Sequence, residues 1–213
     1  MRELTQLIKN YFHSPAHTDM ERTLPDIIIL DFDQTITLQH TGGCASADQL
    51  TPEYIHQNTK AEFIPFIQFA NERAIKLYIA TFSDDQFATE PDQIAGHDLV
   101  KHYMDTMLGV NQTIFELPIR DTRKQIIEYR SIIARMSQDF KDFHLTIIAE
   151  QEKLNLSDKT SLQHILFIDD EKKTLDHIKG AGCAMLANKT RTAAEMAASP
   201  DLFTHLLNWL KTF

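Results

Sequence analysis

Four large aliphatic residues run directly into two acids in this chain, at Ile27-Ile28-Ile29-Leu30-Asp31-Phe32-Asp33. An unbroken apolar run of this length predicts a strand buried on both faces, as in parallel sheets. Open α/β sheets place their sites at the carboxyl ends of such strands, which is where the acids stand. Asp31 and Asp33 are two residues apart and would share one face of a regular strand. Two such carboxylates repel each other unless a cation or a proton lies between them, so the pattern predicts a functional site.

Apolar runs and helical patterns alternate along the rest of the chain. Buried strands are expected at 26–31, 74–80, 114–117, 164–168 and 183–187. Helices are expected at 60–73, after Gly96, and at 121–137, 142–154 and 172–179. Residues 36–59 are polar and predict a loop or a small flap. Strands that alternate with helices predict right-handed βαβ crossovers, so the expected fold class is α/β, a three-layer sandwich with a central parallel sheet.

The length of 213 residues allows one domain with a full hydrophobic core. We expect this domain to cover 1–190 and to begin with a short amphipathic helix at 3–12. A helical tail is expected at 191–213, with Leu206, Leu207 and Leu210 on an apolar stripe. The stripe fits a terminal helix packed on the domain, or one that leads into a further region beyond residue 213, and both interpretations stay open.

The charge balance limits the partners of the protein. The formal net charge of −9 argues against nucleic acid and anionic membranes as main partners, because both need basic faces. No segment approaches the length of a membrane span, and the first residues lack the apolar stretch of a Sec signal peptide. We therefore expect a cytosolic protein, although a non-Sec export route would leave no such mark. Cys44 and Cys183 do not suggest a disulfide framework.

Polar clusters follow three of the expected strands. Besides Asp31 and Asp33, the strand at 74–80 ends in Thr81 and Ser83, and the strand at 164–168 ends in Asp169 and Asp170. Neighbouring parallel strands would bring these clusters to one edge of the sheet. Carboxylate and hydroxyl oxygens are the ligands that Mg²⁺ prefers, so the edge is a candidate magnesium site.

The ordered set resembles the haloacid dehalogenase (HAD) superfamily of aspartyl-phosphate phosphatases, over residues 26–188. The motif Asp31-x-Asp33-x-Thr35 after a hydrophobic strand, joined to Phe167-Ile168-Asp169-Asp170, carries the resemblance. It implies a HAD-like Rossmannoid sandwich without a large cap domain. The chain is also similar, in overall texture, to secreted HAD tyrosine phosphatases among Legionella effectors, which would imply secretion into a host cell by a non-Sec route.

The resemblance assigns roles to individual residues. Asp31 would be the nucleophile that becomes an aspartyl-phosphate, and Asp33 would be the general acid and then the general base. Thr81 would hydrogen-bond a phosphoryl oxygen, and Thr35 and Ser83 are candidate substrate-binding residues. The Mg²⁺ ligands would come from Asp31, Asp33 through its backbone carbonyl, Asp169 and Asp170.

A lysine is expected to offset these acids. The family places it before a helix that leads to the last motif, and Lys141 fits that position. Lys124 and Lys159 remain alternatives. At position 174 this chain has Thr where many relatives carry Asn or Asp near the metal.

The sequence also bears on several other functions. True dehalogenases lack an acid two residues after the nucleophile, so Asp33 favours a phosphatase. Cysteine-based tyrosine phosphatases need Arg six residues after the cysteine, but Leu50 follows Cys44 and Lys189 follows Cys183 at that spacing. A capless, open site predicts a phosphoprotein substrate, with phosphotyrosine preferred. A small-metabolite phosphatase and a binding module built on a decayed phosphatase are the two alternatives.

Overall fold

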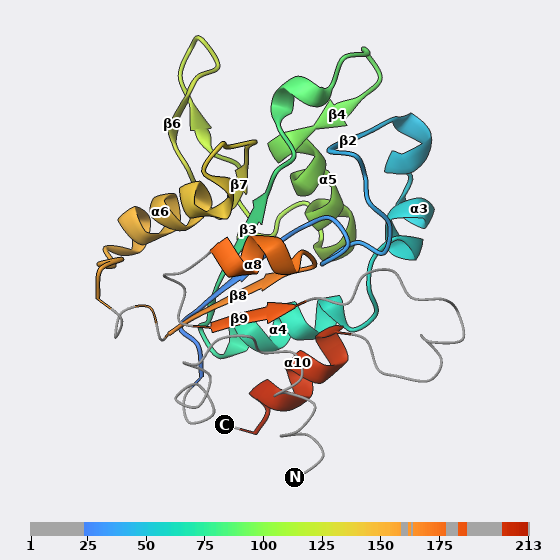
Figure 1. Cartoon of the computed structure of the whole chain (residues 1–213). Coiled ribbons are helices and arrows are strands. Elements are labelled where there is room, and N and C mark those ends of the chain that lie inside the picture. Colours follow the sequence, from blue (N-terminus) through green and yellow to red (C-terminus); the bar gives the residue numbers. More distant parts are fainter. Residues whose placement is uncertain (1–23, 159–161, 163, 178–182, 187–201, 213) are drawn as a thin grey trace.

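Five parallel strands form the central sheet of this computed structural model, which describes residues 24–158, 162, 164–177, 183–186 and 202–212 (Figure 1). The strands are β1 (Ile27–Leu30), β3 (Lys76–Thr81), β7 (Ile132–Ala134), β8 (Ile165–Asp169) and β9 (Cys183–Leu186), in the spatial order β7-β3-β1-β8-β9. All four pairings are parallel. The chain order reverses direction on either side of β1, which makes the carboxyl ends of β1 and β8 the switch point of the sheet.

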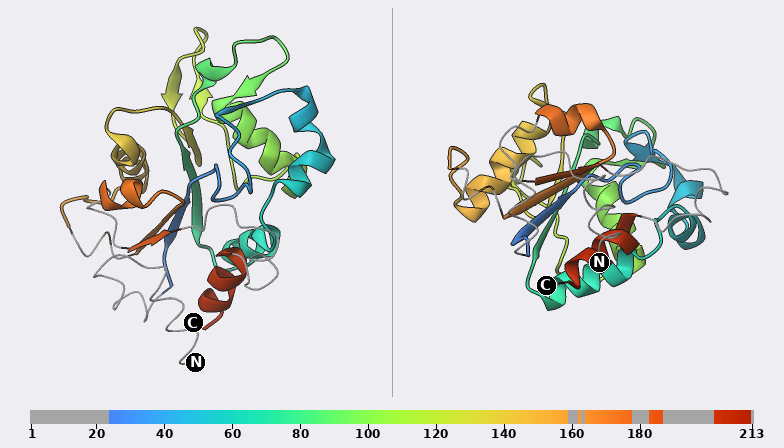
Figure 2. Two further views of the ribbon diagram at one scale, coloured as in Figure 1. Left: turned by 45° about the vertical axis from the view of Figure 1, so that its right-hand side comes forward. Right: turned by 60° about the horizontal axis from the view of Figure 1, so that its bottom comes forward.

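Helices cover both faces of the sheet (Figure 2). One face packs against α4 (Phe63–Glu72), α5 (Gly96–Leu108) and α10 (Leu202–Leu210). The other face packs against α6 (Phe140–Glu152) and α8 (Lys172–His177). Alternate residues of β1 point to the two layers, with Ile28 in the first and Ile29 in the second, as strand geometry requires. The predicted three-layer α/β sandwich is therefore confirmed.

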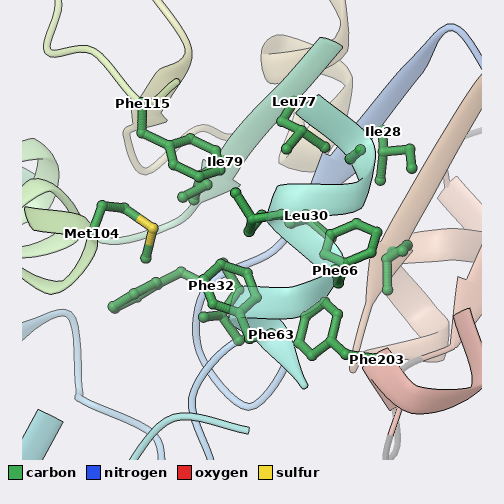
Figure 3. Close-up of a cluster of buried hydrophobic side chains, with 14 of the residues drawn as sticks. Ile28, Leu30, Phe32, Phe63, Phe66, Leu77, Ile79, Met104, Phe115 and Phe203 are labelled. Atoms are coloured by element: carbon green, nitrogen blue, oxygen red, sulfur yellow. The ribbon is translucent and has the colours of Figure 1, made fainter. Parts of the chain in front are cut away.

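The larger core is rich in aromatic side chains (Figure 3). Phe63 and Phe66 of α4 lie about 5.0 and 5.1 Å, ring to ring, from Phe203 of α10. Phe32 meets the ring of Tyr103 from α5 edge to face at 5.2 Å. This packing fixes the residue between the two acids of the first motif, and the described part of the tail, α10, is part of the domain core.

Most of the predicted elements are found close to their expected bounds, but the segment between α5 and α6 is not. Residues 114–117 are not a strand, and Phe115 instead inserts a fully buried ring into the core. The helix expected at 121–137 is wrong as well. This segment contains β6 (Ile126–Glu128), which pairs with β5 (Ile119–Arg120) in an antiparallel hairpin, and then the third core strand, β7. The β-branched pairs Ile126-Ile127 and Ile132-Ile133 fit a pleated strand better than a helix.

Residues 36–59 form a structured flap. They contain β2 (Cys44–Ala45), the short 3-10 helix η1 (Ala47–Leu50) and α3 (Pro52–Gln57), whose Thr51 caps the helix with its side chain. Strand β2 pairs with β4 (Ile94–Ala95), which follows η2 (Asp85–Phe87). The flap thus joins the segment after β1 to the segment after β3.

Two predictions fall wholly or largely outside the described residues, namely the helix at 3–12 and the first part of the tail. Within the described residues, no helix combines the length and apolar character needed to cross a membrane.

Candidate active site at the carboxyl edge of the sheet

The first motif lies in a tight turn at the end of β1. The register sets Leu30 level with Ile79 of β3 and Ile168 of β8, so Asp31 emerges between two neighbouring strands. The backbone N–H of Asp31 still donates to the Ile168 carbonyl at 2.8 Å. The strand then ends, and Gln34 adopts a left-handed conformation with φ of 57°. Asp33 therefore stands on the turn rather than on the strand, although both acids line the same cavity.

The flap holds the carboxyl group of Asp33. Thr41 donates its backbone N–H to Oδ1 at 2.8 Å and its hydroxyl to Oδ2 at 3.2 Å. The Nδ1 of His40 lies 3.4 Å from the same Oδ2. Burial raises the pKa of Asp33, with the charge of Asp31 adding to the effect and Thr41 and His40 opposing it. A carboxyl group with a raised pKa suits proton transfer near neutral pH.

Lys141 provides the positive charge of the site. Its side chain is only 1 % exposed, and its ammonium donates to Asp31 Oδ1 at 2.6 Å and to the Ala80 carbonyl. It also lies 3.7 Å from Asp169 Oδ2 and 4.7 Å from the centre of the Phe82 ring. A lysine this deeply buried is stable as a cation only beside such acids, so the site and the lysine depend on each other.

The two alternative lysines have other positions. Lys124 lies at the tip of the β5–β6 hairpin, where it is exposed, and Lys159 is outside the described residues.

Lys141 stands in the first turn of α6, and His144, one turn later, donates through Nε2 to the Thr81 carbonyl at 3.0 Å. Burial, helped by the nearby charge of Lys141, lowers the pKa of His144 to about 3, so its imidazole is neutral.

Asp169 and Asp170 complete an acidic cluster with Asp31. One ligand atom from each of these three residues lies within 4.8 Å of the others. Asp169 Oδ1 accepts the N–H of Glu171 at 2.8 Å, while its buried Oδ2 has no hydrogen-bond partner. Burial raises the pKa of Asp169 to about 7, and the charge of Asp31 adds to this shift.

This donor set fits a hard divalent cation. A buried carboxylate oxygen without a hydrogen-bond partner, beside two further carboxylates, is an arrangement that a cation stabilises and that is costly without one. Mg²⁺ takes oxygen ligands in an octahedron and keeps several waters, which suits a cluster of carboxylates at the wall of an open cavity. Asp31, Asp169 and Asp170 could therefore hold the ion.

The hydroxyl groups of the site have different surroundings. Thr81, the last residue of β3, lines the cavity and is 2 % exposed. Ser83 also lines it, but its hydroxyl donates to the Gly43 carbonyl at 2.5 Å and accepts the N–H of Gly96 at 2.8 Å. This hydroxyl therefore joins the flap to the start of α5. Thr35 is fully buried, its hydroxyl has no hydrogen-bond partner, and it is not among the residues that line the cavity.

The cavity at this edge has a volume of about 360 Å³. Polar groups from the ends of β1, β3 and β8 form one wall. Apolar side chains also face it, from Phe82, Phe87 and Met136. The site can therefore hold an anionic group against Lys141 together with an apolar group beside it.

Sequence reasoning missed the flap residues that hold Asp33. The pair Gly42-Gly43 was the available signal. Gly43 has φ of 81°, and a Cβ there would lie 2.5 Å from the Phe87 ring, so only glycine fits. Thr174, which stands where the resemblance expects Asn or Asp, lines the cavity and donates its hydroxyl to Glu171 Oε2 at 3.2 Å.

Comparison with known proteins gives structural neighbours only, since no family model and no curated protein matches this chain. A structure of DsGPDH of Dunaliella salina aligns with a TM-score of 0.50 and 14 % identity, and it covers 90 % of this chain. This chain spans 29 % of the length of that protein. At such identity the likeness concerns the fold alone.

A second neighbour is 3-deoxy-D-manno-octulosonate 8-phosphate phosphatase from Moraxella catarrhalis, solved with a magnesium ion, a phosphate ion and a KDO molecule. It aligns at 15 % identity with a TM-score of 0.42, over 79 % of this chain and 71 % of that chain. That likeness is too weak to support an argument about this site. Neither neighbour bears on the similarity to Legionella effectors, which stays a prediction.

Proposed function

We propose that this chain is a HAD-type phosphomonoester hydrolase that works through an aspartyl-phosphate on Asp31. The observation that carries the proposal is the contact between Asp31 Oδ1 and the buried ammonium of Lys141, which lie 2.6 Å apart. Both residues line a cavity that also contains Asp33, a second acid whose pKa is raised. A nucleophilic carboxylate next to a cation and a proton donor is the set of groups that phosphoryl transfer through an acyl phosphate needs.

The first step forms the phosphoenzyme. A carboxylate oxygen of Asp31 attacks phosphorus, and the bond between phosphorus and the leaving oxygen breaks. Asp33 gives its proton to that oxygen, so the alcohol leaves neutral. Lys141 and the hydroxyl of Thr81, which both line the cavity, stabilise the charge on the phosphoryl oxygens, and Thr41 holds the carboxyl group of Asp33 in place.

The second step reverses the proton flow. Asp33, now ionised, takes a proton from water while the water oxygen attacks phosphorus. The bond to Asp31 breaks, and inorganic phosphate and both free carboxyl groups result. A Mg²⁺ ion held by Asp31, Asp169 and Asp170, with the Asp33 backbone carbonyl that the resemblance adds, would neutralise charge on the transferring group.

The finer proposal is that the substrate is a phosphoprotein, with phosphotyrosine preferred. The apolar side chains of Phe82, Phe87 and Met136 at the cavity favour a phosphate carried on an aromatic ring. A small-metabolite phosphatase is the alternative, and a decayed binding module is the second alternative.

Turnover of p-nitrophenyl phosphate, with and without Mg²⁺, tests the reaction class. We expect magnesium-dependent release of p-nitrophenol that Asp31→Asn abolishes. Absence of turnover from the folded wild-type protein in either condition would favour the binding module. Phosphotyrosine and phosphoserine peptides of the same sequence, compared with sugar phosphates, then test the substrate class, and equal rates on all of them would contradict a protein substrate.

A further inference from the structure

The hairpin of β5 and β6, residues 119–128, differs in charge from the rest of the chain. The hairpin itself carries three basic and two acidic side chains, and the longer stretch 119–135 carries five basic and two acidic ones, although the whole chain has a formal net charge of −9. Arg123 and Lys124 lie exposed at the tip, and neither takes part in the ion pairs found among the described residues. An acidic protein thus carries one locally basic projection.

The tip of the hairpin is built so that these cations face outward. Asp121, the acid beside them, accepts the backbone N–H groups of Arg123 at 2.8 Å and Gln125 at 2.9 Å through one carboxylate oxygen. The N–H of Lys124 donates to the Asp121 carbonyl at 3.0 Å. The negative charge of Asp121 therefore orders the turn, while Arg123 and Lys124 remain at the surface.

Exposed apolar side chains gather in the same part of the chain. Of the six large hydrophobic residues exposed in the described part of the structure, five fall between residues 117 and 140, namely Leu117, Ile119, Ile127, Met136 and Phe140. Ile127 is 65 % exposed on the hairpin itself. Single exposed apolar residues are ordinary, but their concentration in one stretch of the chain that also carries exposed cations favours a binding role for this stretch.

The hairpin is tied to the wall of the cavity. Arg120, in β5, forms an ion pair with Asp85, which follows the cavity residue Ser83 by two positions. Asp85 also accepts from buried His97 at 3.0 Å, and the His97 ring accepts the N–H of Ala134 at 3.1 Å. Figure 1 shows the hairpin rising beyond the ends of β3 and β7, on the side of the sheet where those strands end.

We propose that this hairpin docks an acidic polypeptide, the segment of a protein substrate that flanks its phosphorylated residue. This inference rests on the proposed function, because the cavity would hold the phosphorylated side chain while the hairpin contacts the flanking chain. Arg123 and Lys124 attract the acidic side chains of the flanking segment, and Ile127 contacts the apolar side chains of that segment that lie between its acids. Such contacts lie outside the reacting groups, so they act on polypeptides and leave small phosphate esters unaffected.

The test compares two phosphotyrosine peptides that differ only in their flanks, one rich in Glu and one with Gln at the same positions. The double charge reversal Arg123→Glu with Lys124→Glu should lower kcat/KM for the Glu-rich peptide about tenfold, and less at high salt. It should leave the Gln-rich peptide and p-nitrophenyl phosphate unchanged. Arg73→Glu with Lys211→Glu, two exposed cations elsewhere, is the matched control and should change none of the three.

Binding of the Glu-rich peptide to the wild type and to the reversed variant, read by fluorescence anisotropy, separates docking from catalysis. Lost binding in the variant supports docking even where no substrate is turned over, whereas absent turnover alone counts only against the proposed reaction. Equal binding and equal kcat/KM in both proteins would overturn the docking proposal. So would a loss confined to binding of an oligonucleotide, which would make the hairpin a nucleic-acid contact.

Discussion

The carboxyl edge of the sheet and the β5–β6 hairpin both carry cations, but the cation at the edge is buried and paired with acids, whereas those on the hairpin are exposed. At the edge, Lys141 is 1 % exposed and is held by Asp31 and Asp169. On the hairpin, Arg123 and Lys124 are exposed to solvent. Water and salt screen the hairpin charges, whereas the buried charges interact strongly and only with the groups that face them.

This difference separates chemistry from recognition. A substitution in the buried cluster disturbs the reacting groups and the packing together, so it should lower the turnover of every substrate. A substitution on the hairpin alters an exposed surface, so it should change the binding only of ligands large enough to reach the hairpin. Substitutions in each region therefore test whether chemistry and recognition are separate.

The largest expected effect comes from Asp31→Asn. An amide cannot form the acyl phosphate, so kcat should fall by roughly 10⁴-fold or more for every phosphate ester. The hairpin is untouched, so the Glu-rich phosphopeptide should still bind. Steady-state kinetics and anisotropy measure the two effects, and wild-type turnover in this variant would remove Asp31 as the nucleophile.

The accuracy of the predictions from sequence also differed between these two regions. Strands β1 and β8 are uninterrupted apolar runs that end in acids, so local pattern was enough to place Asp31, Asp169 and Asp170 at one edge. Strand β7 has only three residues, and its assignment depends on pairing with β3 across the chain. The isoleucine pairs fit a strand, but a run this short does not settle the assignment without the pairing, so the prediction for 114–137 was wrong.

Within the site, sequence position was enough to favour Lys141 but not to find the partners of Asp33. Thr41 reaches Asp33 because Gly42 and Gly43 fold the flap back over the turn, with φ of 73° and 81°. The backbone conformation of the flap is fixed by contacts with Phe87 and Ser83, from a different crossover. Roles that depend on such long-range contacts need the structure.

Lys141→Met is expected to have the next largest effect. Removing the cation leaves the buried carboxylates of Asp31 and Asp169 facing each other, which should lower the free energy of unfolding by about 3–5 kcal/mol. The loss should be smaller at acidic pH, where the carboxyl groups are protonated, and Mg²⁺ should restore part of it. Urea unfolding measures this. The exposed hairpin residue offers a matched control, since Lys124→Met should stay within about 0.5 kcal/mol of the wild type.

His144 should make the protein sensitive to acid. Its pKa is about 3 in the folded state against an ordinary value of 6.5, so the folded state binds fewer protons between these values. Its contribution to stability is therefore complete above about pH 6.5 and is lost as the pH falls toward 3. Between pH 6.5 and 4.5 the wild type should lose roughly 2–3 kcal/mol more than His144→Gln, whose amide can still donate to the Thr81 carbonyl.

Urea unfolding at the two pH values measures the difference. His56→Gln removes an exposed imidazole and should follow the wild type. Identical acid sensitivity of His144→Gln and the wild type would show that His144 does not drive the loss.

The smallest expected effect, Ser83→Ala, tests whether this hydroxyl binds substrate or positions the flap. The alanine loses the bonds to Gly43 and Gly96. The flap that presents Thr41 to Asp33 should then loosen, and kcat should fall about tenfold, which corresponds to about 1.4 kcal/mol in the activation free energy. Because the damage reaches the general acid, it should be greater for an alkyl phosphate than for p-nitrophenyl phosphate, whose leaving group needs no proton. A rise in KM that is equal for both esters would instead make Ser83 a substrate ligand.

Ser131→Ala is the matched control. Ser131 also accepts a backbone N–H, that of Glu116 at 2.7 Å, but it does not line the cavity. It should leave kcat unchanged for both esters.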